Sequence, residues 1–159
     1  MKKIILAVMM LIGTSTAFAG DSEPLKAILK AQNYAEAANL VQSTLDQLAG
    51  NEEKAKAYNR LYELAMKKVN YEEGIQLENE TQKQMGKEGN KPVDEKGLYA
   101  AVGAAFNSGV EAIKYDNMPN QKGKVKPKYA ALVESVYKLR NDLINGGVYY
   151  QGKDDKMAY

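Results

Sequence analysis

The stretch EEKAKAYNRLYELAMKKV, residues 52–69, decides the fold class of this chain. Its apolar residues recur three and four positions apart, which is the spacing that places them on one face of an α-helix. They are Ala55, Tyr58, Leu61, Tyr62, Ala65 and Val69. The sequence therefore predicts an amphipathic helix over 52–69 with one buried stripe.

The same helical spacing continues toward the N-terminus. A short helix begins after Ser22, a favourable N-cap residue, with Pro24 in its first turn. The pair Gln32-Asn33 ends it, and a second helix is expected over 34–48, with Gly50 beyond its end. These signals predict two short helices before the stretch 52–69.

Helical spacing also continues toward the C-terminus. Further helices are expected over 71–85, over 98–113, and from Lys128 to about Tyr150. Polar connectors over 86–97 and 116–127 contain Gly, Pro and Lys and separate them. Because β-branched residues are sparse and no apolar run is bounded like a strand, the sequence predicts an all-α fold.

The first 19 residues have the three parts of a secretory signal peptide. Lys2 and Lys3 form a positive start, residues 4–12 are an unbroken apolar run, and Ala17-Phe18-Ala19 offers small residues to a signal peptidase. We expect cleavage after Ala19 and a periplasmic or secreted protein, as in a bacterial periplasm. An uncleaved anchor is the alternative, but the run is shorter than the roughly 20 residues that span a bilayer. No stable membrane insertion is expected after cleavage.

Composition limits the chemistry of the remaining chain. Of 22 basic and 20 acidic residues, Lys2 and Lys3 lie in the expected signal peptide, so residues 20–159 carry 20 of each. A near-neutral chain gives no support to a basic surface for nucleic acid. The chain has no His and no Cys, which excludes imidazole-based triads, thiol nucleophiles and most zinc sites. We expect no catalytic residue, no metal and no cofactor.

A short motif recurs in the first half of the chain. Asn33-Tyr34-Ala35-Glu36-Ala37 and Asn70-Tyr71-Glu72-Glu73-Gly74 share the form Asn-Tyr-x-Glu-small and lie 37 residues apart. The period and the residue types resemble the tetratricopeptide repeat. In that repeat an aromatic side chain at the turn lies between two helices, and a small residue three positions later lets them cross closely. The resemblance implies turns before Tyr34 and Tyr71.

Later units fit the repeat less well. Tyr99, Val102, Gly103 and Phe106 look like the first helix of a third unit, but no turn motif follows. Residues 149–159 are similar to the end of one helix, a turn and the start of another. The resemblance implies short antiparallel helix pairs in a right-handed solenoid over 20–159, truncated at the C-terminus. An irregular helical bundle would produce the same amphipathic stripes and remains the alternative.

Two groups of charged residues are weighed as sites. Glu72-Glu73 and Asp154-Asp155 are adjacent pairs, and adjacent residues point about 100° apart on a helix, so neither is a natural acid/base dyad. We interpret them as first-turn acids that the helix dipole favours. Four lysines of the connector over 116–127 and its flank, called here the connector lysines, offer a contact for phosphate or an acidic partner, but no aromatic residue stands among them to stack bases. They are Lys122, Lys124, Lys126 and Lys128. A solvated loop is the simpler interpretation.

Tyrosine is the outstanding side chain, with 11 Tyr against 2 Phe and no Trp. Its apolar ring and polar tip suit both helix packing and a binding groove. Packing is the expected role of Tyr34, Tyr58, Tyr71 and Tyr129, whereas the stripes constrain four others less. These candidate partner-binding residues are Tyr99, Tyr115, Tyr149 and Tyr150.

The tetratricopeptide resemblance implies a function for such a groove. We expect a non-enzymatic, exported scaffold that binds a peptide or protein segment. The alternative is a helical domain that uses carboxylates and tyrosines to bind a small ligand or to catalyse a reaction. Convergent ionisable groups in a deep pocket would favour this alternative, and a shallow elongated groove would favour the scaffold.

Overall fold

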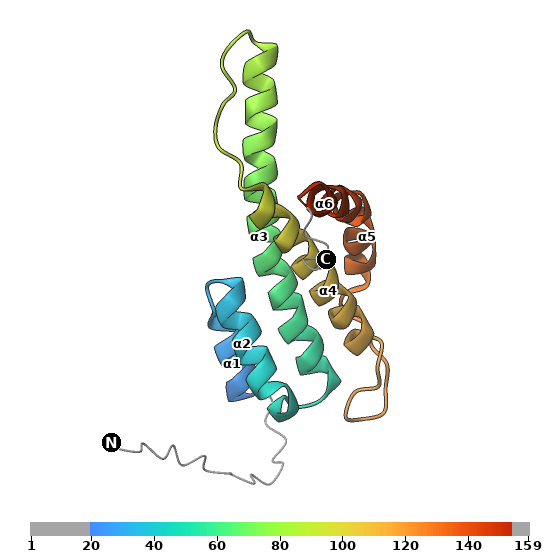
Figure 1. Cartoon of the computed structure of the whole chain (residues 1–159). Helices are drawn as coiled ribbons and strands as arrows, with labels where there is room; N and C mark the ends of the chain where they lie inside the picture. Colours follow the sequence, from blue (N-terminus) through green and yellow to red (C-terminus); the bar gives the residue numbers. More distant parts are fainter. Residues whose placement is uncertain (1–19, 154–159) are drawn as a thin grey trace, which may run out of the picture.

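The computed structural model of this chain describes residues 20–153. The expected signal peptide, its cleavage site after Ala19, the Asp154-Asp155 pair and the expected truncation lie outside the described residues. Within 20–153 the protein consists of six α-helices and one short 3₁₀-helix, without a strand (Figure 1). The all-α prediction is therefore confirmed for this part of the chain.

Two short helices open the described part, and both begin at the predicted residues. Helix α1 spans Glu23–Lys30, and the Ser22 hydroxyl accepts a hydrogen bond of 3.3 Å from the Leu25 N–H. Helix α2 spans Tyr34–Thr44 and is followed by the 3₁₀-helix η1, Leu45–Gln47. The Asn33 side chain caps α2 by accepting the Glu36 N–H at 2.9 Å. Both N-termini thus follow from a single polar side chain each.

Helix α3 is one continuous helix, so the predicted turn at Asn70-Tyr71 is wrong. It spans Asn51–Gln84, 34 residues, which is about 50 Å at the usual rise per residue. An Asn caps the start of a helix only where its own backbone is not helical. Here Val69 and Glu72, on either side of the motif, are both buried and hold the backbone in place. Tyr71 is 65% exposed and separates no helices.

Beyond Gly74, α3 projects from the rest of the protein, and the connector to α4 returns alongside it (Figure 1). The Asn79 side chain donates to the Lys91 carbonyl at 2.8 Å and accepts the Lys91 N–H at 2.9 Å. Gly89 approaches α3 so closely that a Cβ atom there would lie 2.0 Å from the Asn79 carbonyl oxygen. The connector is therefore held to α3 by two hydrogen bonds of the Asn79 side chain and by the close backbone approach at Gly89.

Helix α4, Glu95–Asp116, packs along α3 and forms the centre of the protein. Its start is capped by the Asp94 carboxylate, which accepts the Gly97 N–H at 2.9 Å. One face of α4 buries Leu98 and Val102 against Val69 of α3. The outer face remains available for other contacts.

The predicted C-terminal helix is broken in two at Leu139. Helix α5 spans Ala130–Lys138 and helix α6 spans Arg140–Gly152, and the chain changes direction between them (Figure 1). Leu139 is buried against Ala65 and Ala105. Because of this break, α5 and α6 run in different directions and each packs against α4. One straight helix over the same residues could not make both contacts. No helix in residues 20–153 combines the length and the apolar character that a bilayer crossing requires.

Candidate binding groove

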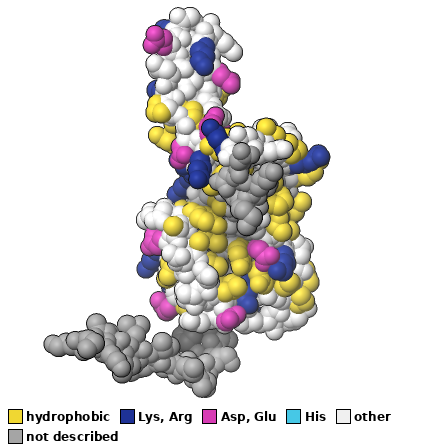
Figure 2. Space-filling view, viewed as in Figure 1, with side chains coloured by type: hydrophobic (Ala, Val, Ile, Leu, Met, Phe, Trp, Pro, Cys, Tyr) yellow, Lys and Arg dark blue, Asp and Glu magenta, His cyan; other side chains and the backbone are white. Residues whose placement is uncertain are grey.

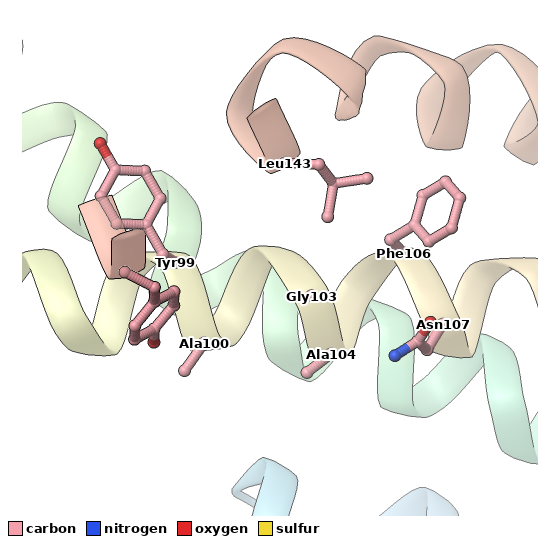
Figure 3. Close-up of a pocket in the computed structure, with 8 residues that line it drawn as sticks. Tyr99, Ala100, Gly103, Ala104, Phe106, Asn107 and Leu143 are labelled. Atoms are coloured by element: carbon pink, nitrogen blue, oxygen red, sulfur yellow. The ribbon is translucent and has the colours of Figure 1, made fainter. Parts of the chain in front are cut away.

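A groove of about 480 Å³ lies on the outer face of α4, beside α6 (Figure 3). Its floor is made by the small residues Ala100, Gly103 and Ala104 of α4. Tyr99 lies at one end, Phe106 and Asn107 lie at the other, and Leu143 of α6 reaches over the floor between them (Figure 3). Tyr150 of α6 completes the lining. The groove is thus predominantly apolar, with aromatic side chains near both ends.

The helical period explains why α4 has both a buried face and a groove face. Leu98, Val102 and Ala105 point into the core, whereas positions 99, 103 and 106 fall on the neighbouring face, spaced by four and three residues. Gly103 has no heavy atom within 4 Å of the place where a Cβ would stand. The floor is therefore open at its centre. Figure 2 shows hydrophobic side chains gathered over the middle of the molecule on the side drawn in Figure 1.

Three of the four candidate tyrosines meet at one end of the groove. The rings of Tyr99 and Tyr149 have centroids 5.2 Å apart at an interplanar angle of 41°. Tyr149 and Tyr150 are also 5.2 Å apart, in an edge-to-face arrangement at 79°. The Tyr150 hydroxyl donates to the Lys96 carbonyl at 3.3 Å, which ties α6 to the start of α4. We call Tyr99, Tyr149 and Tyr150 the tyrosine cluster.

Tyr115 does not belong to the tyrosine cluster. It lies near the other end of α4 and stacks on Tyr58 of α3, with ring centroids 5.7 Å apart and planes within 9°. The ammonium groups of Lys54 and Lys114 lie 5.6 Å and 5.2 Å from the centre of its ring. Tyr115 therefore takes part in an α3–α4 contact and does not line the groove.

Two partly buried carboxylates lie beside the tyrosine cluster. Val69, Leu143 and Tyr99 share one hydrophobic cluster. Glu73 of α3 follows Val69 by one helical turn, and Asp142 of α6 immediately precedes Leu143, so both acids lie at the edge of this cluster. Burial raises the pKa of Glu73, and the charge of Asp142 raises it further. Burial also raises the pKa of Asp142.

Two carboxylates act on Tyr99 at the tyrosine end of the groove. The pKa of Tyr99 is raised by burial first, and then by the charges of Glu95 and Asp142. Within the described part of the chain, neither Glu73 nor Asp142 forms an ion pair with a lysine or arginine. The expectation that Glu73 is a first-turn acid is wrong, because it lies in the middle of α3.

Glu72 faces a different environment from its neighbour and has a structural role. It is only 3% exposed, and its carboxylate accepts the Lys68 ammonium at 2.6 Å and the Asp94 N–H at 2.9 Å. These hydrogen bonds, that of Lys68 first, lower the pKa of Glu72. The interpretation of Glu72 as a first-turn acid is also wrong, since it fastens the connector to the middle of α3.

Two other buried carboxylates act in the same way. Glu53 accepts the N–H groups of Ser22 and Ala49, each at 2.7 Å. Asp116 accepts the N–H groups of Lys128, at 2.8 Å, and Tyr129, at 2.8 Å. The sequence alone did not predict these hydrogen bonds of Glu53, Glu72 and Asp116. The signal that could have found these acids is their spacing, since each continues the buried stripe of its helix.

The connector lysines remain solvated. All four side chains are exposed, and the Lys128 ammonium lies 3.6 Å from a Glu52 carboxylate oxygen. In residues 20–153 no three acidic, His or Cys side chains are grouped so that they could hold a metal ion. The groove with its tyrosine cluster is therefore the feature of the described chain that best fits a ligand.

Comparisons with protein-family models, with curated proteins and with solved structures find no match for this chain. The class of protein is consequently set by its own features, an all-helical domain with an apolar groove. A functional assignment rests on the chemistry of that groove.

Proposed function

We propose that this protein is an exported, non-enzymatic scaffold that binds a peptide or protein segment in the groove beside α4 and α6. The observation that carries the proposal is the groove itself, an apolar channel of about 480 Å³ with a floor of small residues and aromatic side chains near both ends. Grooves of this kind accept an amphipathic helix or an extended segment through its apolar side chains.

The lining explains how a segment would be held. The absence of a side chain at Gly103 allows a partner backbone to approach α4 closely. Tyr99 and Phe106 offer large apolar surfaces that lose little conformational entropy on binding. Asn107 adds one amide that can donate and accept hydrogen bonds at the end opposite the tyrosine cluster.

The tetratricopeptide relationship is part of this proposal. Its best support is the unit formed by α1, α2 and the first half of α3, where Tyr34 packs against two buried clusters, one containing Leu61 and the other Ala65. An aromatic residue between helices is what the repeat requires. The Asn70-Tyr71 motif lies inside α3 and supplies no second turn. We therefore propose one repeat-like unit followed by diverged helices, in place of a regular solenoid of short helix pairs.

Site-specific crosslinking tests the proposed groove. A photo-crosslinking amino acid is placed at Ala100, which is exposed on the groove floor, and, as a control, at Ala131, which is exposed on α5 outside the groove. The full chain is expressed and irradiated in cells. We expect a peptide or protein adduct at position 100 only, and its loss when Gly103→Trp fills the floor. Equal adducts at both positions, or none at position 100, would contradict the proposal.

The alternative function is supported by one specific observation. The pKa values of Glu73 and Asp142 are both raised by burial, and that of Glu73 also by the charge of Asp142, and perturbed carboxylates are common in ligand-binding and catalytic sites. A small molecule that copurifies with the protein and is released by Gly103→Trp, with no protein adduct, would favour this alternative. The open, mainly apolar groove favours a peptide.

A further inference from the structure

The two ends of the groove differ in charge. At one end, the carboxylates of Glu95 and Asp142 act on Tyr99, and Glu73 of α3 lies close enough to Asp142 to be affected by its charge. At the other end, Phe106 and Asn107 are uncharged. This difference in charge would favour one orientation of a bound segment, in addition to the apolar contacts along the groove.

Within the described residues, Glu73 and Asp142 have no lysine or arginine paired with them. The neighbouring basic residues Lys96, Arg140 and Lys153 are all exposed. Two like charges that are partly removed from water destabilise the site unless a positive group approaches. A partner can supply this group when it binds.

The aromatic rings at this end suit a cation as well. The Lys153 ammonium already lies 5.8 Å from the centre of the Tyr149 ring, within the range of a cation–π contact. Tyr99 lies against the same ring, 5.2 Å away. An arginine or lysine side chain can bind such a site in two ways, by a cation–π contact with a ring face and by a charge-assisted hydrogen bond to a carboxylate.

We infer that the segment bound in the groove carries a lysine or arginine beside its apolar residues, and that Glu73 and Asp142 receive this positive charge at the tyrosine cluster. The inference rests on the proposed function and names the chemistry of its partner. It also sets the orientation of the bound segment, with the basic residue toward Tyr99 and the apolar residues over Gly103 and toward Phe106.

Peptide selection tests the inference with the full chain. A display library of random 12-residue peptides is selected on the wild-type protein, on Gly103→Trp and on the double variant Glu73→Gln/Asp142→Asn. We expect wild-type selections to combine apolar residues with lysine or arginine. The double variant should keep the apolar preference and lose the basic one. Selection on Asp46→Asn/Glu80→Gln, which removes two exposed acids elsewhere, controls for net charge and should match the wild type.

The best selected peptide is then measured by fluorescence anisotropy. Replacing its basic residue by citrulline, or by norleucine in the case of lysine, should weaken binding to the wild type by about tenfold, the value of one charge-assisted contact. The same replacement should leave binding to Glu73→Gln/Asp142→Asn nearly unchanged. This double comparison separates the specific contact from general attraction. Circular dichroism confirms that each variant is folded.

The possible failures are distinct. Peptides that bind the wild type but not Gly103→Trp, without any basic preference, would overturn the inference and leave the groove function standing. An absence of peptides enriched over Gly103→Trp would overturn the inference and count against the groove function together. If N-acetyl-arginine amide competes as strongly as the peptide, the site recognises a small cation, and the inferred peptide partner is wrong.

Discussion

The carboxylate of Glu72, in the middle of α3, accepts a hydrogen bond of 2.9 Å from the backbone N–H of Asp94, at the start of α4. Asp94 in turn caps α4 through the Gly97 N–H, and the Lys68 ammonium pairs with both acids at 2.6 Å and 2.9 Å. This cluster ends the connector and sets where α4 begins. The position of Tyr99, two residues beyond Gly97, depends on it.

Acid should weaken this cluster. The Lys68 contact and backbone hydrogen bonds lower the pKa values of Glu72 and Asp94 in the folded protein. Their contribution to stability is therefore complete above the ordinary glutamate pKa of 4.5 and is lost as the pH falls through the lowered values. Glu72→Ala should lower the melting temperature at neutral pH and should reduce this loss in acid. The exposed control Glu80→Ala should do neither, and thermal unfolding followed by circular dichroism checks both.

The pair at the tyrosine end should respond to pH in the opposite direction. The pKa values of Glu73 and Asp142 are raised, so their ionisation destabilises the fold above the raised values, and this penalty disappears as the pH falls through them. Glu73→Gln/Asp142→Asn should be more stable than the wild type at neutral pH, and the difference should shrink in mild acid. Denaturant titrations across this range measure the effect. If the double variant were less stable than the wild type at neutral pH, the ionised pair would be stabilising the fold, and the prediction would be wrong.

Two glycines of α4 should respond oppositely to the same substitution. Gly103→Ala meets no neighbour and improves helix propensity, so we expect about 0.5–1 kcal/mol of stabilisation. At Gly109 a new Cβ would lie 2.3 Å from a Val136 methyl group, so Gly109→Ala should destabilise the α4–α5 contact by about 1–3 kcal/mol. Urea unfolding measures both free energies. If Gly103→Ala destabilised the protein as much as Gly109→Ala, the groove floor at Gly103 could not be open.

The two Asn-Tyr motifs should also differ on mutation. Asn33 caps α2, and Asn33→Ala should cost about 1 kcal/mol. Asn70 is exposed inside α3, so Asn70→Ala should stabilise the protein by a few tenths of a kcal/mol through helix propensity. The free energies of unfolding of both variants test this. A loss at Asn70 as large as at Asn33 would indicate a cap and therefore a break in α3.

Export is tested at the N-terminus. We expect protein isolated from the cell envelope to begin at Gly20, because Ala17 and Ala19 suit the signal peptidase. Ala19→Leu should block processing, whereas Gly20→Ala should not. Intact-mass spectrometry distinguishes the two forms. Envelope protein that retains residues 1–19 in the wild type would support the uncleaved anchor.

Caps and stripes allowed much of the fold to be predicted. The starts of α1 and α2 depend on one side chain each, Ser22 and Asn33, and the buried face of α3 follows from spacing within 52–69. These features are local, since a helix N-terminus needs an acceptor only two or three residues before the N–H it satisfies. They could therefore be recognised without knowledge of any partner helix.

The candidate site was predicted only in part. The sequence selects Tyr99, Tyr149 and Tyr150 as candidates because the helical stripes do not require them for packing, and the structure brings their rings together. The same criterion selects Tyr115, which stacks on Tyr58 instead. Glu73 and Asp142 were not recognised as a site, because they belong to helices far apart in the sequence. Only the packing of α6 against α4 places the charge of Asp142 beside Tyr99.

The sequence by itself determined that this protein is helical and where several helices begin, because periodicity and capping act within a few residues. The tertiary structure decided that α3 continues through Asn70 and that the last helix breaks at Leu139. Both outcomes depend on buried contacts between helices, Val69 with Leu98 and Leu139 with Ala65 and Ala105. Such burial outweighs the small free energies of local turn preferences, and the groove exists only where α6 returns to α4.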